Sequence, residues 1–209
     1  MKKSAIAVCL MALCSATVFA QNSARSFAHN RAKSEIRVPA PDAPLALTKI
    51  FGNLGPKTAA YDPLNGWFIG GPNSGLDEFM GLAFTPKTNA HVTQVQVAIT
   101  YFSGDDQVNL SIYSDAGGVP GTLIDGPVTV PNLPANGSCC AMAIANFPSG
   151  VAVVAGTQYW VVADTPWSGT GADFLGVWEQ ETKPQPFAFG NGVWTPAALP
   201  AGAVYGTVP

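Results

Sequence analysis

The run Thr93-Gln94-Val95-Gln96-Val97-Ala98-Ile99-Thr100-Tyr101 decides the fold class of this chain of 209 residues. Its apolar side chains recur at every second position, which is the period of a β-strand with one buried and one solvated face. The same alternation returns over residues 108–113. Between the two runs, residues 103–106 read Ser-Gly-Asp-Asp, a composition that favours a turn. We therefore predict two strands joined as a β-hairpin.

Short apolar runs continue through most of the chain. They lie at residues 67–69, 79–84, 128–130, 141–147, 158–163, 174–178, 187–189 and 203–207. Gly, Pro, Asn or Asp clusters separate most of these runs, and no stretch after Lys49 has a helical period. About ten short strands predict an all-β fold, a β-sandwich of jelly-roll type over residues 49–209. Residues 159–162 are apolar on both faces, which indicates a central strand covered on both sides.

The composition excludes several classes of protein. Charged residues make up 11% of the chain, hydrophobic residues 47%, and the formal net charge is -3 at pH 7. Gly (22) and Pro (18) together are 40 of the 209 residues, or about 19%, whereas their average combined usage is roughly 12%. Low charge with high apolar content excludes a disordered tail, and the Gly and Pro content argues against a helix bundle. The acidic balance argues against a nucleic-acid partner.

The first 20 residues have the pattern of a secretory signal peptide. Met1-Lys2-Lys3 is a cationic start, residues 5–19 are apolar or small, and residues 18–20 read Val-Phe-Ala before the expected cleavage. A membrane anchor is the alternative, but this run is shorter than the roughly 20 residues that span a bilayer. We expect an exported protein, extracellular or periplasmic, whose mature chain begins at Gln21 and has no transmembrane segment.

Residues 21–48 are expected to form a flexible arm ahead of the domain. Five basic and two acidic side chains lie within residues 21–49. Residues 38–44 read Val-Pro-Ala-Pro-Asp-Ala-Pro, and such closely spaced prolines favour extended chain over regular pairing. A mobile linker is the favoured interpretation, and a tether to an anionic surface is the alternative.

Three segments carry a family resemblance. They are VNLSIYSDAGGVPGTLI at 108–124, VAVVAGTQYWVVA at 151–163 and FAFGNGVWTPAALPAGAV at 187–204. On these segments the chain resembles the bacterial secreted "choice-of-anchor" domains, most closely the R type, over roughly residues 50–207. The resemblance implies a β-sandwich and no defined catalytic role. Family members end in different anchoring tails, whereas residues 203–209 carry no recognisable sorting signal, which favours free secretion.

Catalytic motifs are not found. The sequence holds no Gly-x-Ser-x-Gly elbow, no His-Glu-x-x-His and no phosphate-binding loop. Glu179 and Glu181 flank Gln180, so on a strand their side chains share a face about 7 Å apart, a spacing that inverting glycosidases use. With Asp173 they carry the hypothesis of an enzyme, but a solvated strand end is the favoured interpretation. His91 is expected to be a polar residue at a strand end. We predict no enzymatic activity.

A structural Ca²⁺ site is one further candidate. Acidic turns are candidates because Ca²⁺ takes six to eight oxygen ligands. The candidate ligands are Asp77, Glu78, Asp105, Asp106 and Asp115.

Cys139 and Cys140 are the two cysteines that remain after the expected signal cleavage, and their redox state is the other open point. An exported chain meets an oxidising compartment. A disulfide between these neighbours, two free thiols and intermolecular bonds all stay open, and the disulfide between neighbours is favoured.

The tryptophans give the one functional hint. Carbohydrate-binding modules stack sugar rings on exposed aromatic faces. The five tryptophans are Trp67, Trp160, Trp167, Trp178 and Trp194, of which Trp160 is expected in the core. Trp167 and Trp194 lie in or near predicted loops and, with Trp178, are the candidate ligand-binding residues; the alternative is that all five are buried.

The sequence is therefore compatible with two functions. One is an exported structural or interaction module at the cell surface or in extracellular matrix, contacting a surface protein. The alternative is a carbohydrate-binding module that uses loop aromatics, with Ca²⁺ as an assisting ion. Exposure of Trp167 and Trp194 on one concave face would favour the second function, and burial of both would favour the first.

Overall fold

The protein is an all-β sandwich, which confirms the predicted fold class. The computed structural model describes residues 26–28, 47–182, 188–190, 193–195 and 199–209. These residues form fourteen strands, in three sheets of antiparallel strands, and one short 3₁₀ turn, η1 (Lys57–Ala59). Within the same residues, no helix is long and apolar enough to cross a membrane.

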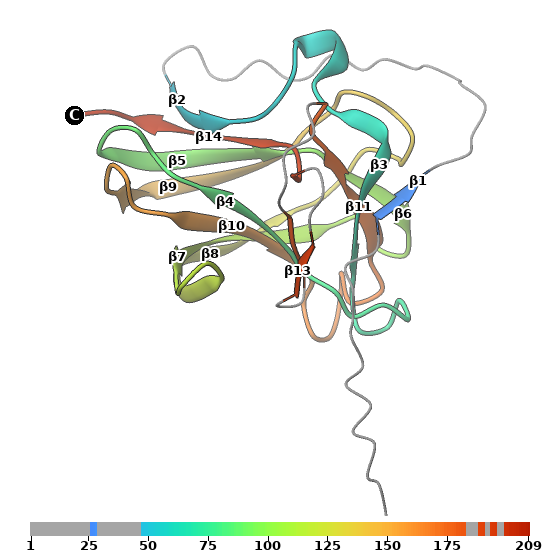
Figure 1. Ribbon diagram of the computed structural model, residues 1–209. Helices are drawn as coiled ribbons and strands as arrows, with labels where there is room; N and C mark the ends of the chain where they lie inside the picture. Colours follow the sequence, from blue (N-terminus) through green and yellow to red (C-terminus); the bar gives the residue numbers. More distant parts are fainter. Residues whose placement is uncertain (1–25, 29–46, 183–187, 191–192, 196–198) are drawn as a thin grey trace, which may run out of the picture.

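Two of the sheets face each other and form the layers of the sandwich (Figure 1). One layer has the order β2 (Thr48–Gly52), β14 (Gly202–Thr207), β5 (Ala90–Val97) and β9 (Ala143–Val153). The other has the order β13 (Val193–Thr195), β12 (Ala188–Gly190), β4 (Met80–Phe84), β10 (Tyr159–Asp164), β7 (Val108–Asp115) and β8 (Pro120–Val130). Most neighbours in these sheets are not consecutive in sequence, as in Greek-key and jelly-roll sandwiches.

The third sheet continues the first layer at one side of the molecule. Its order is β1 (Ser26–Ala28), β3 (Asp62–Gly70), β11 (Leu175–Gln180) and β6 (Ile99–Ser103). β5 and β6 follow each other directly, with only Ala98 between them, so one extended stretch serves two sheets. β1 lies inside the segment 21–48 that was expected to be a flexible arm, and it pairs with β3. The rest of that arm and the expected signal peptide lie outside the described residues.

The core fills the space between the layers with side chains from alternate strand positions. Val95 and Val97 of β5 project from one layer, and Leu110 of β7 and Val161 of β10 project from the other; all four are fully buried. Trp178 of the third sheet joins the same cluster. The period of two that is visible in the sequence therefore marks the inward face, as predicted.

The predicted hairpin between the runs 93–101 and 108–113 is wrong. The first run forms β5 and β6, which pair with β9, β14 and β11, while β7 pairs with β8 and β10. Residues 104–107 therefore cross from one sheet to another. Alternation specifies which face of a strand is buried, but it does not specify the neighbouring strand.

The central position of residues 159–162 is confirmed. β10 lies between β4 and β7, so both of its edges are hydrogen-bonded. Val161 faces the main core, whereas Trp160 and Val162 form a separate buried cluster on the opposite face, against Ala83 and Tyr113.

A matched pair of leucines tests this placement of the core. Leu110→Ala removes a fully buried side chain and should lower the free energy of unfolding by about 2–5 kcal/mol. Leu123→Ala on β8, where the side chain is 44% exposed, should cost less than about 1 kcal/mol. Urea unfolding followed by circular dichroism measures both values, and equal losses would contradict the assigned faces.

Candidate functional site

Three loops meet at one end of the sandwich and present an exposed tryptophan. We call this region the Trp167 end and define it as residues 71–79, 104–107 and 165–174. The backbone N–H of Gly71 donates to the carbonyl of Phe174 at 2.9 Å, and that of Asn73 donates to Ala172 at 3.1 Å. The carboxylate of Asp105 accepts a hydrogen bond from the N–H of Gly171 at 2.5 Å. Each loop is thus braced by a neighbouring loop.

Trp167 is the candidate ligand-binding residue that the structure exposes. Its side chain is 76% exposed, between Pro166 and the turn at Ser168-Gly169. Trp178 is fully buried, and its indole N–H donates to the carbonyl of Ala201 at 2.8 Å, so the prediction that Trp178 contacts a ligand is wrong. Trp194 lies in β13, and its side chain is outside the described part of the chain.

The Trp167 end is acidic. Its three loops contain Asp77, Glu78, Asp105, Asp106 and Asp173, and no Lys, Arg or His. Asp77, Asp106 and Asp173 are exposed, and the other two are half-buried. Carboxylates gathered at one end of a molecule make the local potential negative, which attracts cations and repels anions.

Asp115, the remaining candidate ligand for Ca²⁺, lies at the opposite end of β7 and holds a turn. Its Oδ1 accepts hydrogen bonds from the indole N–H of Trp160 at 2.8 Å and from Gln158 Nε2 at 2.7 Å. The N–H of Gly118 lies 3.1 Å from both carboxylate oxygens. These donors, with that of Trp160 contributing most, lower the pKa of Asp115. The carboxylate stabilises the β7–β8 turn.

No cluster of three or more His, Cys, Asp or Glu side chains suited to a metal occurs in the part of the chain that the structure describes. Asp105 already accepts a hydrogen bond from the loop beside it, and Asp115 lies far from the other four candidates along β7. The structural Ca²⁺ therefore stays a prediction.

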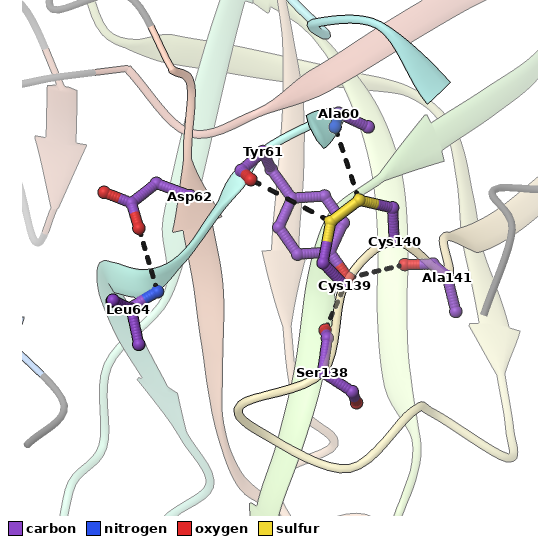
Figure 2. The surroundings of a disulfide bond; sticks show 8 residues. All are labelled: Ala60, Tyr61, Asp62, Leu64, Ser138, Cys139, Cys140 and Ala141. Carbon is purple, nitrogen blue, oxygen red and sulfur yellow. Dashed lines mark hydrogen bonds between the residues drawn. A yellow bond between two sulfur atoms is a disulfide. The ribbon is translucent and has the colours of Figure 1, made fainter. Parts of the chain in front are cut away.

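Cys139 and Cys140 form a disulfide on the outer face of the sheets, beside Tyr61 (Figure 2). The N–H of Ala60 donates to Cys140 Sγ at 3.3 Å. The hydroxyl of Tyr61 points at the carbonyls of Ser138 and Ala141, at 2.9 and 3.1 Å, which flank the disulfide on either side (Figure 2). The hydroxyl of Tyr61 thus holds the backbone on both sides of the disulfide.

The two glutamates proposed as a solvated pair are buried, so that interpretation is wrong. Glu179 is fully buried and Glu181 is 6% exposed, because the chain around residues 199–201 and the segment near Asn53 cover them. Glu181 Oε1 accepts a hydrogen bond from the N–H of Leu199 at 3.3 Å. Asp173 and His91, in contrast, are exposed.

Glu179 forms a polar cluster with Thr100, which is also buried, and Asn136, which is half-buried. The hydroxyl of Thr100 donates to Glu179 Oε1 at 2.7 Å. Asn136 Nδ2 donates to Thr100 Oγ1 at 3.1 Å and lies 3.4 Å from Glu179 Oε1. Glu179 Oε2 is buried and has no hydrogen-bond partner. We call these three residues the Glu179 cluster.

Burial dominates the electrostatics of this region. It raises the pKa of Glu179 well above 4.5, against the opposing effect of the Thr100 hydrogen bond, and the nearby charge of Asp62 raises it further. The pKa of Tyr61 is also raised, by burial first and by Glu179 second. Glu179 is therefore a neutral carboxylic acid at a pH where exposed glutamates are ionised.

The comparisons with known proteins add no relative. No protein-family model and no curated protein matches this chain. The resemblance to choice-of-anchor domains therefore stays a prediction, and functional inference rests on the geometry of the two regions above.

Sequence reasoning missed the roles of Thr100, Asn136 and Tyr61. These residues are separated from their partners by 36 to 80 positions, and each looks like an ordinary strand or turn residue. The one local signal was the pair Glu179 and Glu181 in an apolar context, directly after the buried Trp178.

Glu179→Gln tests the buried neutral acid. A carboxyl whose pKa is raised on folding supports the fold fully below its unfolded pKa, and this contribution is lost as pH rises through the folded pKa. Wild type should therefore lose stability as pH rises above about 4.5, by up to about 1.4 kcal/mol per pH unit from this group. The amide variant should lack that part of the slope.

The measurement is urea unfolding of both proteins across a pH series. Asp164, whose pKa burial raises to about 6, and Glu181, whose pKa burial also raises, contribute slopes of the same sign to both proteins. The difference between wild type and variant therefore isolates Glu179. Parallel curves would show that Glu179 is not the buried neutral acid described here.

Proposed function

We propose that this chain is an exported, non-catalytic binding module that holds a carbohydrate at the cell surface or in extracellular matrix. The contact residue is Trp167. The observation that carries the proposal is its 76% exposure on a braced loop, in a domain whose tryptophans Trp67, Trp160 and Trp178 are each 1% exposed or less. An indole face held in water offers a sugar ring a large apolar area at little entropic cost, because its loop is already ordered.

The charge of the Trp167 end narrows the ligand class. Five carboxylates and no cationic side chain lie in the three loops. An acidic polysaccharide would meet like charge, whereas a neutral glycan or an amino sugar with free ammonium groups would not. An ammonium group over the indole would also gain a cation–π contact. We therefore favour neutral or cationic glycans.

The absence of catalysis is part of the proposal. The two carboxyl groups that carried the hypothesis of a glycosidase, Glu179 and Glu181, are buried on the sheet rather than displayed at the Trp167 end. A glycosidase needs two carboxyl groups that both reach the scissile bond. The expected signal peptide and the resemblance to choice-of-anchor domains support the exported location.

Trp167→Ala should abolish or weaken glycan binding by at least about tenfold, or 1.4 kcal/mol. The measurement is retention of the protein on insoluble neutral, amino-sugar and acidic polysaccharides, with tryptophan fluorescence read on each soluble fragment that binds. Val154→Ala is the matched control, because Val154 is 55% exposed in the turn at the other end of β10 and should bind like wild type.

Two arms of the same assay separate the alternatives. Binding that requires Ca²⁺ and is lost with a chelator would add the predicted ion to the site. Retention on every acidic matrix and on no neutral one would contradict the charge argument. If no polysaccharide retains the folded protein, the carbohydrate function fails, and the structural module that contacts a surface protein takes its place.

A further inference from the structure

The Glu179 cluster brings together the three groups that an acyl transfer needs. Thr100 supplies a hydroxyl, Asn136 a carboxamide and Glu179 a carboxyl group. The nitrogen of Asn136 donates a hydrogen bond to the hydroxyl oxygen at 3.1 Å and lies 3.4 Å from the carboxyl oxygen that accepts a hydrogen bond from the hydroxyl. A nucleophile, an acyl group and a proton carrier are thus held in mutual contact.

The cluster is closed to water at Thr100 and Glu179, and Asn136 lies at its half-buried edge. Thr100 and Glu179 are fully buried, beside the apolar cluster that includes Ala98, Ala201 and Tyr61. Glu179 Oε2 has no partner, although a carboxyl oxygen so deeply buried normally has one. An unsatisfied acid beside a hydroxyl and an amide is costly to keep in a fold, which points to a chemical use.

We propose that Thr100 and Asn136 become joined by an ester bond in the folded protein. Thr100 Oγ1 attacks the side-chain carbonyl carbon of Asn136, and the bond between that carbon and Nδ2 breaks. The hydroxyl proton passes through Glu179 Oε1 to the departing nitrogen. The products are one ester and one ammonia, so no oxidant, reductant or other reactant is required.

Glu179 is suited to that transfer by its position. Its Oε1 already accepts a hydrogen bond from the hydroxyl that must lose a proton, and it lies 3.4 Å from the nitrogen that must gain one. The ionised form receives the hydroxyl proton at Oε1 and passes the same proton to the nitrogen, so its charge is restored. Glu179 therefore acts in the reaction and is regenerated at its end.

The cross-link would tie β6 to the segment that carries the disulfide. Tyr101 already donates its N–H to Pro134 at 2.7 Å and accepts the N–H of Asn136 at 2.7 Å, so the two segments are aligned before any bond forms. A covalent bond there would resist unfolding of the outer-face segment in a protein that works outside the cell.

One competing reaction also releases ammonia from Asn136. Gly137 follows it, and the backbone nitrogen of Gly137 can attack the same carbonyl carbon to give a cyclic imide. Ammonia loss alone therefore does not identify the ester. The imide would form without Thr100 and would leave residues 100 and 136 on separate peptides.

Peptide mapping distinguishes the two products. Trypsin cleaves after Lys87, and a protease that cleaves before aspartate then places Thr100 in residues 88–104 and Asn136 in residues 125–163. After reduction of the disulfide, wild type incubated at neutral pH should yield these two segments as one joined species, lighter by one ammonia than their sum. Mild alkali should separate them.

Three variants assign the roles. Thr100→Ser keeps the hydroxyl and should retain the joined species, whereas Thr100→Val, of nearly equal shape, should lose it completely. Glu179→Gln should also lose it, because the amide cannot carry the proton. Circular dichroism shows whether each variant is folded, and Thr100→Ser tests the proposal even if Thr100→Val does not fold.

The proposal is overturned by either of two results. The first is wild type that keeps its full mass and gives only separate segments after prolonged incubation. The second is ammonia loss that persists in folded Thr100→Val, which would assign the chemistry to the imide. Neither result bears on carbohydrate binding, which is measured at the Trp167 end.

Discussion

The structure depends on the backbone of Ala98, where one extended stretch of chain changes sheets. Its N–H donates to the carbonyl of Ala201 at 3.0 Å, and its carbonyl accepts the N–H of Glu179 at 2.8 Å. The N–H of Ala201 in turn donates to the carbonyl of Glu179 at 2.8 Å. These three bonds join the sheet of β6 and β11 to the sheet of β5 and β14, so the first layer stays continuous around the core.

The same junction explains why polar side chains are buried on an outer face. Alternation places Gln96, Ala98 and Thr100 on the side of the strand away from the main core. Residues 53–61 and the segment that carries the disulfide pack over this side and form a second apolar cluster there. Gln96 satisfies its amide by donating to Gln94 at 2.9 Å. Thr100 finds its acceptor in Glu179.

The sequence predicted features that depend on a few successive residues, such as strand positions. It did not predict features that depend on how distant segments come together, such as strand pairing and the burial of Glu179. Alternation located the strands, because burial of one face is a property of a few successive residues. It paired the first two runs wrongly, because residues 104–107 lead to another sheet. Glu179 was expected in water, because the residues that cover it come from distant segments. The loop position of Trp167 was predicted correctly, because Pro166 and the following Ser-Gly mark a loop in the sequence itself.

The proposed ligand contact and the proposed ester bond lie in different parts of this molecule for a physical reason. A tryptophan can remain in water without disturbing the fold only if its loop is held by other contacts, and backbone hydrogen bonds to neighbouring loops provide them. A neutral acid beside a hydroxyl requires the opposite, since water would ionise the acid and hydrate the hydroxyl. Low-dielectric surroundings preserve that pair, and on the outer face of this layer they are provided where other segments of the chain cover the sheet. These surroundings suit Glu179 to the proposed reaction with its own chain, and Trp167 to the proposed contact with an external ligand.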